Sequence, residues 1–79
     1  MENFKQIFDK VLIKTLFINE EDIKPNIHFT NDLGVDSLDL VELTIEFEKV
    51  FKITISDEDA QSLQTIGGAE GYLREKIKF

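Results

Sequence analysis

Apolar residues recur every three or four positions near the start of the chain, and this spacing predicts an amphipathic helix running roughly from Glu2 to Leu16. Its apolar stripe consists of Phe4, Ile7, Phe8, Val11, Leu12 and Thr15. Lysines occupy the other sides, and the polar face is short and mixed in charge. We therefore expect this stripe to pack in a protein core and not on a membrane.

A second predicted helix begins at Ser37 and carries apolar residues on two sides. At about 100° per residue, one group falls within a single arc and forms an ordinary core stripe. This group is Leu40, Leu43, Phe47, Val50 and Phe51. The other group, interleaved with Glu42, Glu48 and Lys49, is Leu38, Val41 and Ile45. The second stripe is either an exposed surface for docking partners or a face that another helix covers.

Residues 18–35 have no sustained period and contain breaker residues, so they predict a long loop with one helical turn near Glu20 to Ile23. We expect apolar side chains to pin this loop: Ile23, Ile27, Phe29 and Leu33. His28 also lies here, and no motif places it beside Ser37, so we interpret it as a surface or capping residue.

After the second helix, residues 53–55 alternate like a strand but have no partner strand, which favours an extended linker. Ser56 and the three acids after it predict a short helix that ends near Leu63. We expect Gly67 and Gly68 to break the chain before a last helix, Ala69 to Ile77, with Thr65 or Gly67 as its cap. The pattern predicts one all-α domain spanning residues 1–79. It is a small four-helix bundle of three longer helices and one short helix, with a long loop between the first and second helices.

Charge is concentrated around the second helix. The chain has 79 residues and a net charge of −7, and residues 32–59 hold nine acids and two bases while the remainder is balanced. This excess argues against nucleic acid as a partner and favours proteins that present basic patches. With no cysteine, no signal peptide and no apolar run long enough to cross a membrane, we expect a cytoplasmic protein without membrane insertion.

Ser37 has the most distinctive local context in the chain. Asp36 is a good N-cap and Asp39 stands where a capping box places an acid, so Ser37 would be the first helical residue. Its hydroxyl would lie at a helix N-terminus, where free N–H groups and the helix dipole favour a phosphate. The alternative is that Ser37 has a purely structural role at the helix start.

The sequence around Ser37 lacks the residues that a hydrolase, a metal site or an acid–base catalyst would require. A hydrolase nucleophile needs a Gly-x-Ser-x-Gly turn and a nearby base, and neither is evident. A calcium loop counted from Asp32 would have Ser37 in place of glycine and Leu43 in place of glutamate. With no cysteine and one histidine, a zinc site is not expected, and the carboxylates do not converge for acid–base catalysis. We therefore expect no enzymatic activity.

The segment from Asp32 to Asp39 resembles the attachment motif of acyl carrier proteins, with Asp36-Ser37-Leu38 at its centre. The resemblance extends through Glu42-Leu43, Phe51 and residues 55–60 to Tyr72, and so covers nearly the whole chain. It implies that a phosphopantetheinyl transferase esterifies Ser37 with 4′-phosphopantetheine taken from coenzyme A. The thiol of that group would carry an acyl chain as a thioester, which fits a chain without cysteine.

The resemblance also implies two sets of binding positions. Positions that would face partner enzymes are Asp36, Leu38, Asp39, Val41, Glu42, Ile45 and Glu48. Positions that would line a pocket for the acyl chain are Phe29, Leu43, Phe47, Ile55, Ala60, Leu63, Ala69 and Tyr72. For the pocket set the alternative is simply a packed core. Phe47 is bulkier than the aliphatic residue usual in the family, which predicts a shorter or differently shaped pocket.

These observations leave three functions open. The first is a free-standing, monomeric acyl carrier protein that serves fatty-acid, polyketide or related acyl-transfer and elongation enzymes with basic docking patches. The second is a carrier of aminoacyl or peptidyl groups. The third is an unmodified acidic adaptor that binds proteins through Leu38, Val41 and Ile45.

Overall fold

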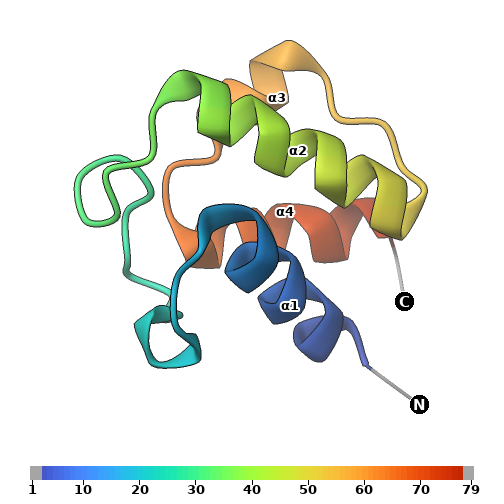
Figure 1. The fold of residues 1–79 in the computed structure, drawn as a ribbon. Helices are drawn as coiled ribbons and strands as arrows, with labels where there is room; N and C mark the ends of the chain where they lie inside the picture. Colours follow the sequence, from blue (N-terminus) through green and yellow to red (C-terminus); the bar gives the residue numbers. More distant parts are fainter. Residues whose placement is uncertain (1–2, 78–79) are drawn as a thin grey trace.

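The computed structural model describes residues 3–77 and contains four α-helices within that range (Figure 1). The helices are α1 (Phe4–Leu16), α2 (Ser37–Phe51), α3 (Asp57–Ser62) and α4 (Ile66–Ile77), with a 3-10 turn, η1 (Glu20–Asp22), in the first connection. In this view α1 and α4 lie on one side of α2, and α3 lies beside its first half. The predicted all-α fold of three longer helices and one short helix is confirmed, as is the long loop before α2.

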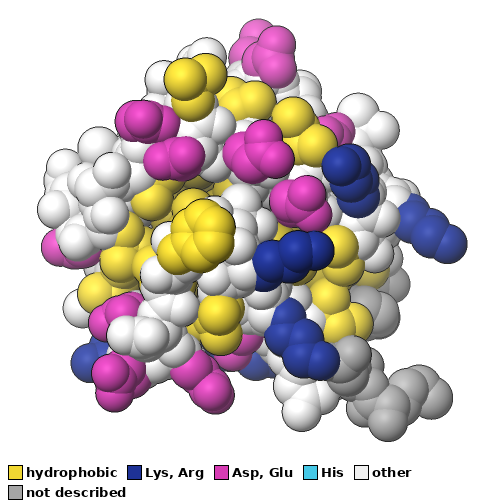
Figure 2. All heavy atoms as spheres, in the orientation of Figure 1, with side chains coloured by type: hydrophobic (Ala, Val, Ile, Leu, Met, Phe, Trp, Pro, Cys, Tyr) yellow, Lys and Arg dark blue, Asp and Glu magenta, His cyan; other side chains and the backbone are white. Residues whose placement is uncertain are grey.

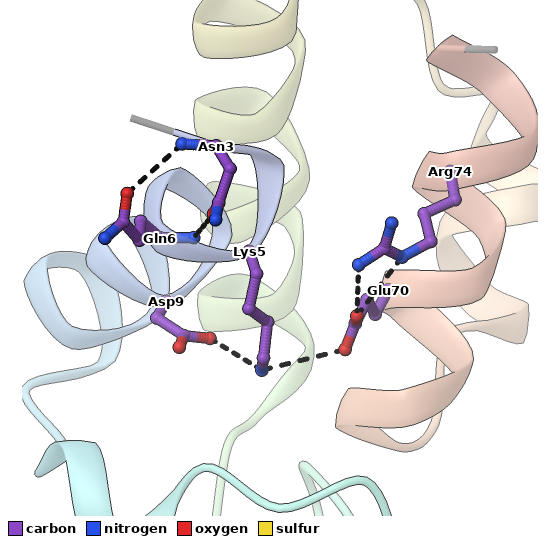
Figure 3. Close-up of polar contacts among 6 residues, drawn as sticks. All are labelled: Asn3, Lys5, Gln6, Asp9, Glu70 and Arg74. Carbon is purple, nitrogen blue, oxygen red and sulfur yellow. Dashed lines mark hydrogen bonds and ion pairs between the residues drawn. The ribbon is translucent and has the colours of Figure 1, made fainter. Parts of the chain in front are cut away.

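Helix α1 begins with a complete capping box. The Asn3 side chain accepts the N–H of Gln6 at 2.9 Å, and Oε1 of Gln6 accepts the N–H of Asn3 at 3.1 Å (Figure 3). These two bonds satisfy backbone donors that the first turn of a helix leaves unpaired. The helix ends at Leu16, as predicted, whereas Glu2, the predicted start, lies outside the described residues.

Four phenylalanine rings join α1 to α2 at the centre of the core. Phe8 stacks on Phe47 with ring centroids 5.4 Å apart and an interplanar angle of 4°, and Phe4 contacts Phe51 at 5.3 Å. Such pairs contribute about 0.5–1.5 kcal/mol each beyond the area they bury. Both Phe8 and Phe47 are completely buried. The bulk of Phe47 is therefore used to hold α1 against α2.

Val50 departs from the predicted core stripe of α2. Its side chain is 43% exposed, whereas Leu43 and Phe47 on the same face are buried. Val50 borders a hollow between the two helices that Ile7 and Val11 of α1 also line. The prediction that Val50 is a core residue is wrong because α1 does not close over this edge of α2.

The long loop is attached to the start of α4 through backbone hydrogen bonds. The N–H of Phe29 donates to the carbonyl of Gln64 at 2.8 Å, and the N–H of Ile66 donates to the carbonyl of Ile27 at 3.0 Å. Phe29 is buried, and Ile23, Ile27 and Leu33 pack against the core as predicted. A loop of this length is thus fixed in place from both its side chains and its backbone.

Helix α4 starts three residues earlier than predicted, because Gly67 and Gly68 are helical and do not break the chain. A Cβ at Gly67 would lie 2.9 Å from the carbonyl oxygen of Pro25, and the Gly67 N–H donates to that oxygen at 3.0 Å. Glycine is needed here for the close approach of the loop. The Thr65 hydroxyl accepts the N–H of Gly68, so Thr65 is the cap, one of the two predicted candidates.

A network of charged side chains connects α1 to α4 at the surface (Figure 3). Nζ of Lys5 lies 2.9 Å from Asp9 and 3.7 Å from Glu70, and Glu70 accepts two hydrogen bonds from Arg74. The Arg74 guanidinium also lies 4.7 Å from the centre of the Phe4 ring, a cation–π distance. These contacts hold α4 beside α1.

Candidate functional site

The turn before α2 places Ser37 at the surface. Gly34 has φ +69°, a left-handed conformation that glycine adopts without strain. Val35 is buried and its N–H donates to the carbonyl of Phe29 at 2.9 Å, so the turn is anchored to the core. Oδ1 of Asp36 accepts the N–H of Asp39 at 2.8 Å, and Asp36 is the N-cap of α2, as predicted.

Ser37 is therefore the first residue of α2, and its side chain is exposed. Within the described part of the chain, neither its hydroxyl nor its N–H has a protein hydrogen-bond partner, and neither does the N–H of Leu38. These donors and the positive end of the helix dipole lie beside the hydroxyl. The surroundings of Ser37 can accommodate a phosphate ester on its Oγ atom.

The second apolar stripe of α2 remains uncovered. The exposed fractions are 79% for Leu38, 51% for Val41 and 38% for Ile45. Among residues 3–77 no helix covers this face, so of the two interpretations the exposed surface is the one observed. Figure 2 shows apolar side chains mixed with acidic ones over α2, with Lys and Arg side chains near its C-terminal end and below it. An apolar strip with an acidic border has the composition of a surface that binds proteins with basic patches.

Glu48 differs from the other acidic residues of this face. It is half-buried, and its Oε2 accepts the backbone N–H of Ile55 at 2.8 Å. This bond ties the end of α2 to the extended linker that leads to α3. Glu48 therefore has a structural role in addition to any contact with a partner.

A pocket of about 450 Å³ opens between α2 and α3. Its lining residues are Ser37, Leu40, Val41, Thr44, Ile45, Glu48, Ile55, Asp57, Ala60 and Gln61. Ser37 lies at the edge of a cavity whose walls are largely apolar. The cavity is of a size that can hold a small apolar ligand.

The predicted pocket residues are divided between this cavity and the core. Ile55 and Ala60 line the cavity. Five others are buried in the closed core, namely Phe29, Leu43, Phe47, Leu63 and Ala69. Tyr72 packs at the edge of that core. Whether the core set opens to an acyl chain stays a prediction.

Several cavity residues are absent from the predicted pocket set. Thr44 is buried, and its hydroxyl donates to the carbonyl of Val41 at 2.8 Å, so it presents an aliphatic surface to its neighbours. Gln61 lines the opposite wall from α3. Spacing could have identified Thr44, since Ser37, Leu40, Val41 and Thr44 share one helix face at intervals of three and four. Gln61 has no comparable signal in the sequence.

Tyr72 joins α4 to α3. Its hydroxyl donates to Oδ2 of Asp59 at 2.7 Å. Burial, the hydrogen bond to Asp59 with its negative charge, and the charge of Glu48 raise the pKa of Tyr72 to about 12. Tyr72 is therefore a neutral donor at physiological pH.

His28 lies in the loop and acts as a cap, since its Nδ1 accepts the N–H of Asn31 at 3.3 Å. Among residues 3–77, no group of three or more His, Asp or Glu side chains is arranged to hold a metal ion. A search of the same residues finds no helix with the length and apolar character that crossing a membrane requires.

A small helical bundle with an exposed serine at the start of its central helix, next to an apolar pocket, is the architecture of a carrier domain. Residues 8–73 match the sequence model of a family described as "Phosphopantetheine attachment site". The match covers most of the chain, and the protein belongs to this family.

A solved structure gives the same result. The chain is similar to the solution structure of a protein from Anaplasma phagocytophilum assigned as an acyl carrier protein. The two are 33% identical with a TM-score of 0.81, and the alignment covers 95% of this chain and 89% of the other. The chain therefore has the acyl carrier fold and is a carrier protein of that type.

Proposed function

We propose that this protein is a free-standing acyl carrier whose Ser37 Oγ is esterified with 4′-phosphopantetheine. The observation that carries the proposal is the position of Ser37: exposed, first in α2, and at the edge of the pocket between α2 and α3. In the loading reaction, Oγ bonds to the phosphorus of coenzyme A that bears pantetheine. The pyrophosphate bond breaks, adenosine bisphosphate leaves, and a phosphopantetheinyl transferase accepts the hydroxyl proton.

The chain itself supplies binding and orientation. The free N–H groups of Ser37 and Leu38 and the dipole of α2 favour the charged ester at this point. When bound, the prosthetic group supplies a thiol that forms thioesters. Asp36 fixes the helix start through its bond to Asp39 and so fixes the direction in which Ser37 presents its oxygen.

The pocket gives the cargo a place away from water. Leu40, Ile45, Ile55 and Ala60 provide apolar wall next to Ser37. Burial of an acyl chain contributes about 0.8 kcal/mol per methylene. We place the acyl chain first in this pocket. A longer chain would extend from it toward the predicted pocket residues that lie in the core.

Docking occurs on the exposed face of α2. Leu38, Val41 and Ile45 provide apolar contacts, while Asp36, Asp39 and Glu42 attract basic patches, and Glu48 lies at the far end of this face. Acidic side chains around Ser37 increase association rates with such patches at low ionic strength. The partners are the transferase and the acyl-transfer and elongation enzymes of fatty-acid, polyketide or related synthesis. They act on a monomeric carrier in the cytoplasm that has no catalytic role.

Intact mass tests the proposal. The wild type, incubated with coenzyme A and a broad-specificity phosphopantetheinyl transferase, should gain one phosphopantetheine increment, and Ser37→Ala should gain none. Ser62→Ala is the matched control, because Ser62 is also exposed on a helix near the pocket but is not at a helix start. An unmodified wild type with an intact fold, tested with several transferases, would disprove the carrier function.

An acidic adaptor is the second candidate, and the uncovered strip of Leu38, Val41 and Ile45 favours it. If the protein is an adaptor, the Ser37→Ala variant should bind its partners as well as the wild type does. If it is a carrier, the same variant should transfer no cargo. An aminoacyl carrier is distinguished by the thioester that forms after loading, which mass spectrometry of the modified protein identifies.

A further inference from the structure

The end of α1 carries an unusual residue for its conformation. Phe17 is the C-cap of α1, with φ 56° and ψ 39°, and its N–H donates to the carbonyl of Ile13 at 3.0 Å. This left-handed position ordinarily favours glycine, and a bulky residue there is strained. The Phe17 side chain is also 92% exposed, so burial of its ring in this chain does not offset the strain.

Phe17 is not isolated on the surface. It lines a shallow hollow between the end of α1 and the start of α2, together with Leu38, the residue that follows Ser37. Leu38 is 79% exposed, so two large apolar side chains from different helices border one depression beside the attachment serine. The apolar surface next to Ser37 therefore extends beyond α2.

The remaining wall of the hollow is mostly acidic. Asp39, Glu42 and Glu46 of α2 line it, with Lys14 and Thr15 of α1 on the other side. Glu46 lies 3.9 Å from Lys49, and both Asp39 and Glu42 are exposed. Three carboxylates against one lysine make this border negative, which complements a surface carrying Lys or Arg.

We infer that Phe17 is an anchor through which enzymes that attach phosphopantetheine to Ser37, or act on it there, recognise this carrier. The inference rests on the proposed carrier function and adds a second docking element on α1. The partner enzyme would bind the Phe17 ring in an apolar recess that is surrounded by Lys or Arg side chains. Interfaces are enriched in aromatic side chains, phenylalanine included, and have a polar rim, which is the combination found at Phe17.

Steady-state kinetics with the phosphopantetheinyl transferase and coenzyme A test this role. Phe17→Gly should raise the KM for the carrier about tenfold or more and leave kcat within about twofold, because docking is lost while Ser37 is unchanged. Glycine suits the conformation at this position, so the variant should unfold at the same temperature as the wild type or higher. Phe17→Tyr keeps the ring and should retain the wild-type KM.

Val50→Ala is the matched control, since Val50 is an exposed apolar residue that lies outside this hollow. An unchanged KM in a folded Phe17→Gly variant would overturn the inference while the carrier function stands. A wild type that accepts no phosphopantetheine would instead disprove the carrier function on which it rests. If the wild type sediments as a dimer and Phe17→Gly as a monomer, the anchor serves a second copy, which also overturns the inference.

Discussion

The hydroxyl of Tyr72 in α4 donates a 2.7 Å hydrogen bond to the carboxylate of Asp59 in α3. Helix α3 has only six residues and none of them is buried, so it needs attachment from its neighbours. Because Ala60 and Gln61 of α3 form one wall of the pocket, this bond also fixes the pocket's shape.

The bond predicts a specific alkaline loss of stability. The pKa of Tyr72 is raised to about 12 in the folded protein and is about 10 in an unfolded chain. Because the pKa is higher in the folded protein, the contribution of the Tyr72 hydroxyl to stability is complete below about pH 10. It is lost as the pH rises toward 12.

Tyr72→Phe should therefore be less stable than the wild type by about 1 kcal/mol at neutral pH, because it leaves Asp59 without this donor. Urea unfolding of both proteins, from neutral pH up to the folded-state pKa of Tyr72 at about 12, measures the difference in the free energy of unfolding. We expect the difference to narrow above about pH 10. A difference that stays constant through this range would contradict the role given to the hydroxyl.

Two glycines of α4 should respond to alanine in opposite directions. At Gly67 a Cβ would lie 2.9 Å from the Pro25 carbonyl, so Gly67→Ala must displace the loop and should destabilise the fold by about 1–3 kcal/mol. At Gly71 nothing lies within 4 Å of the added carbon, so Gly71→Ala should stabilise it by about 0.5–1 kcal/mol. Thermal unfolding measures both, and equal effects would show that the contact with Pro25 is unimportant.

These examples show which features local sequence could predict. The cap at Asp36, the start of α3 directly after Ser56 and the end of α1 at Leu16 depend on neighbouring residues, and the sequence predicts all three. The prediction that Gly67 breaks the chain is wrong, because glycine is needed there for the close approach of Pro25, a residue distant in sequence. The exposure of Val50 likewise depends on where α1 crosses α2, which periodicity within one helix does not specify.

The site shows the same division. One helical wheel is enough to group Leu38, Val41 and Ile45 as a second stripe, but it left open whether another helix covers them, and the structure shows them exposed. The pocket requires two helices to be positioned against each other, so the sequence did not predict Gln61. Phe17 could have been noticed as an aromatic residue at a helix end, but its left-handed conformation and its proximity to Leu38 are tertiary facts.

A larger side chain in the pocket should reduce the length of the acyl chain that the pocket can hold. In the modified wild type, the unfolding temperature should rise with acyl-chain length until the pocket is full, because each buried methylene contributes about 0.8 kcal/mol. In Ala60→Phe the added ring occupies the pocket, and the rise should stop at a shorter chain. Ser62→Phe, with its ring on the same helix outside the pocket lining, is the control. Identical series for Ala60→Phe and the wild type would place the chain elsewhere.

The central claim is that Ser37 Oγ carries the phosphopantetheine. Fragment-ion mass spectrometry of the transferase-treated protein locates the modification to one residue and tests this claim most directly. We expect the whole increment on the peptide that contains Ser37, at that residue, with Ser56 and Ser62 unmodified. An increment on any other hydroxyl, or none on a folded chain, would contradict the account.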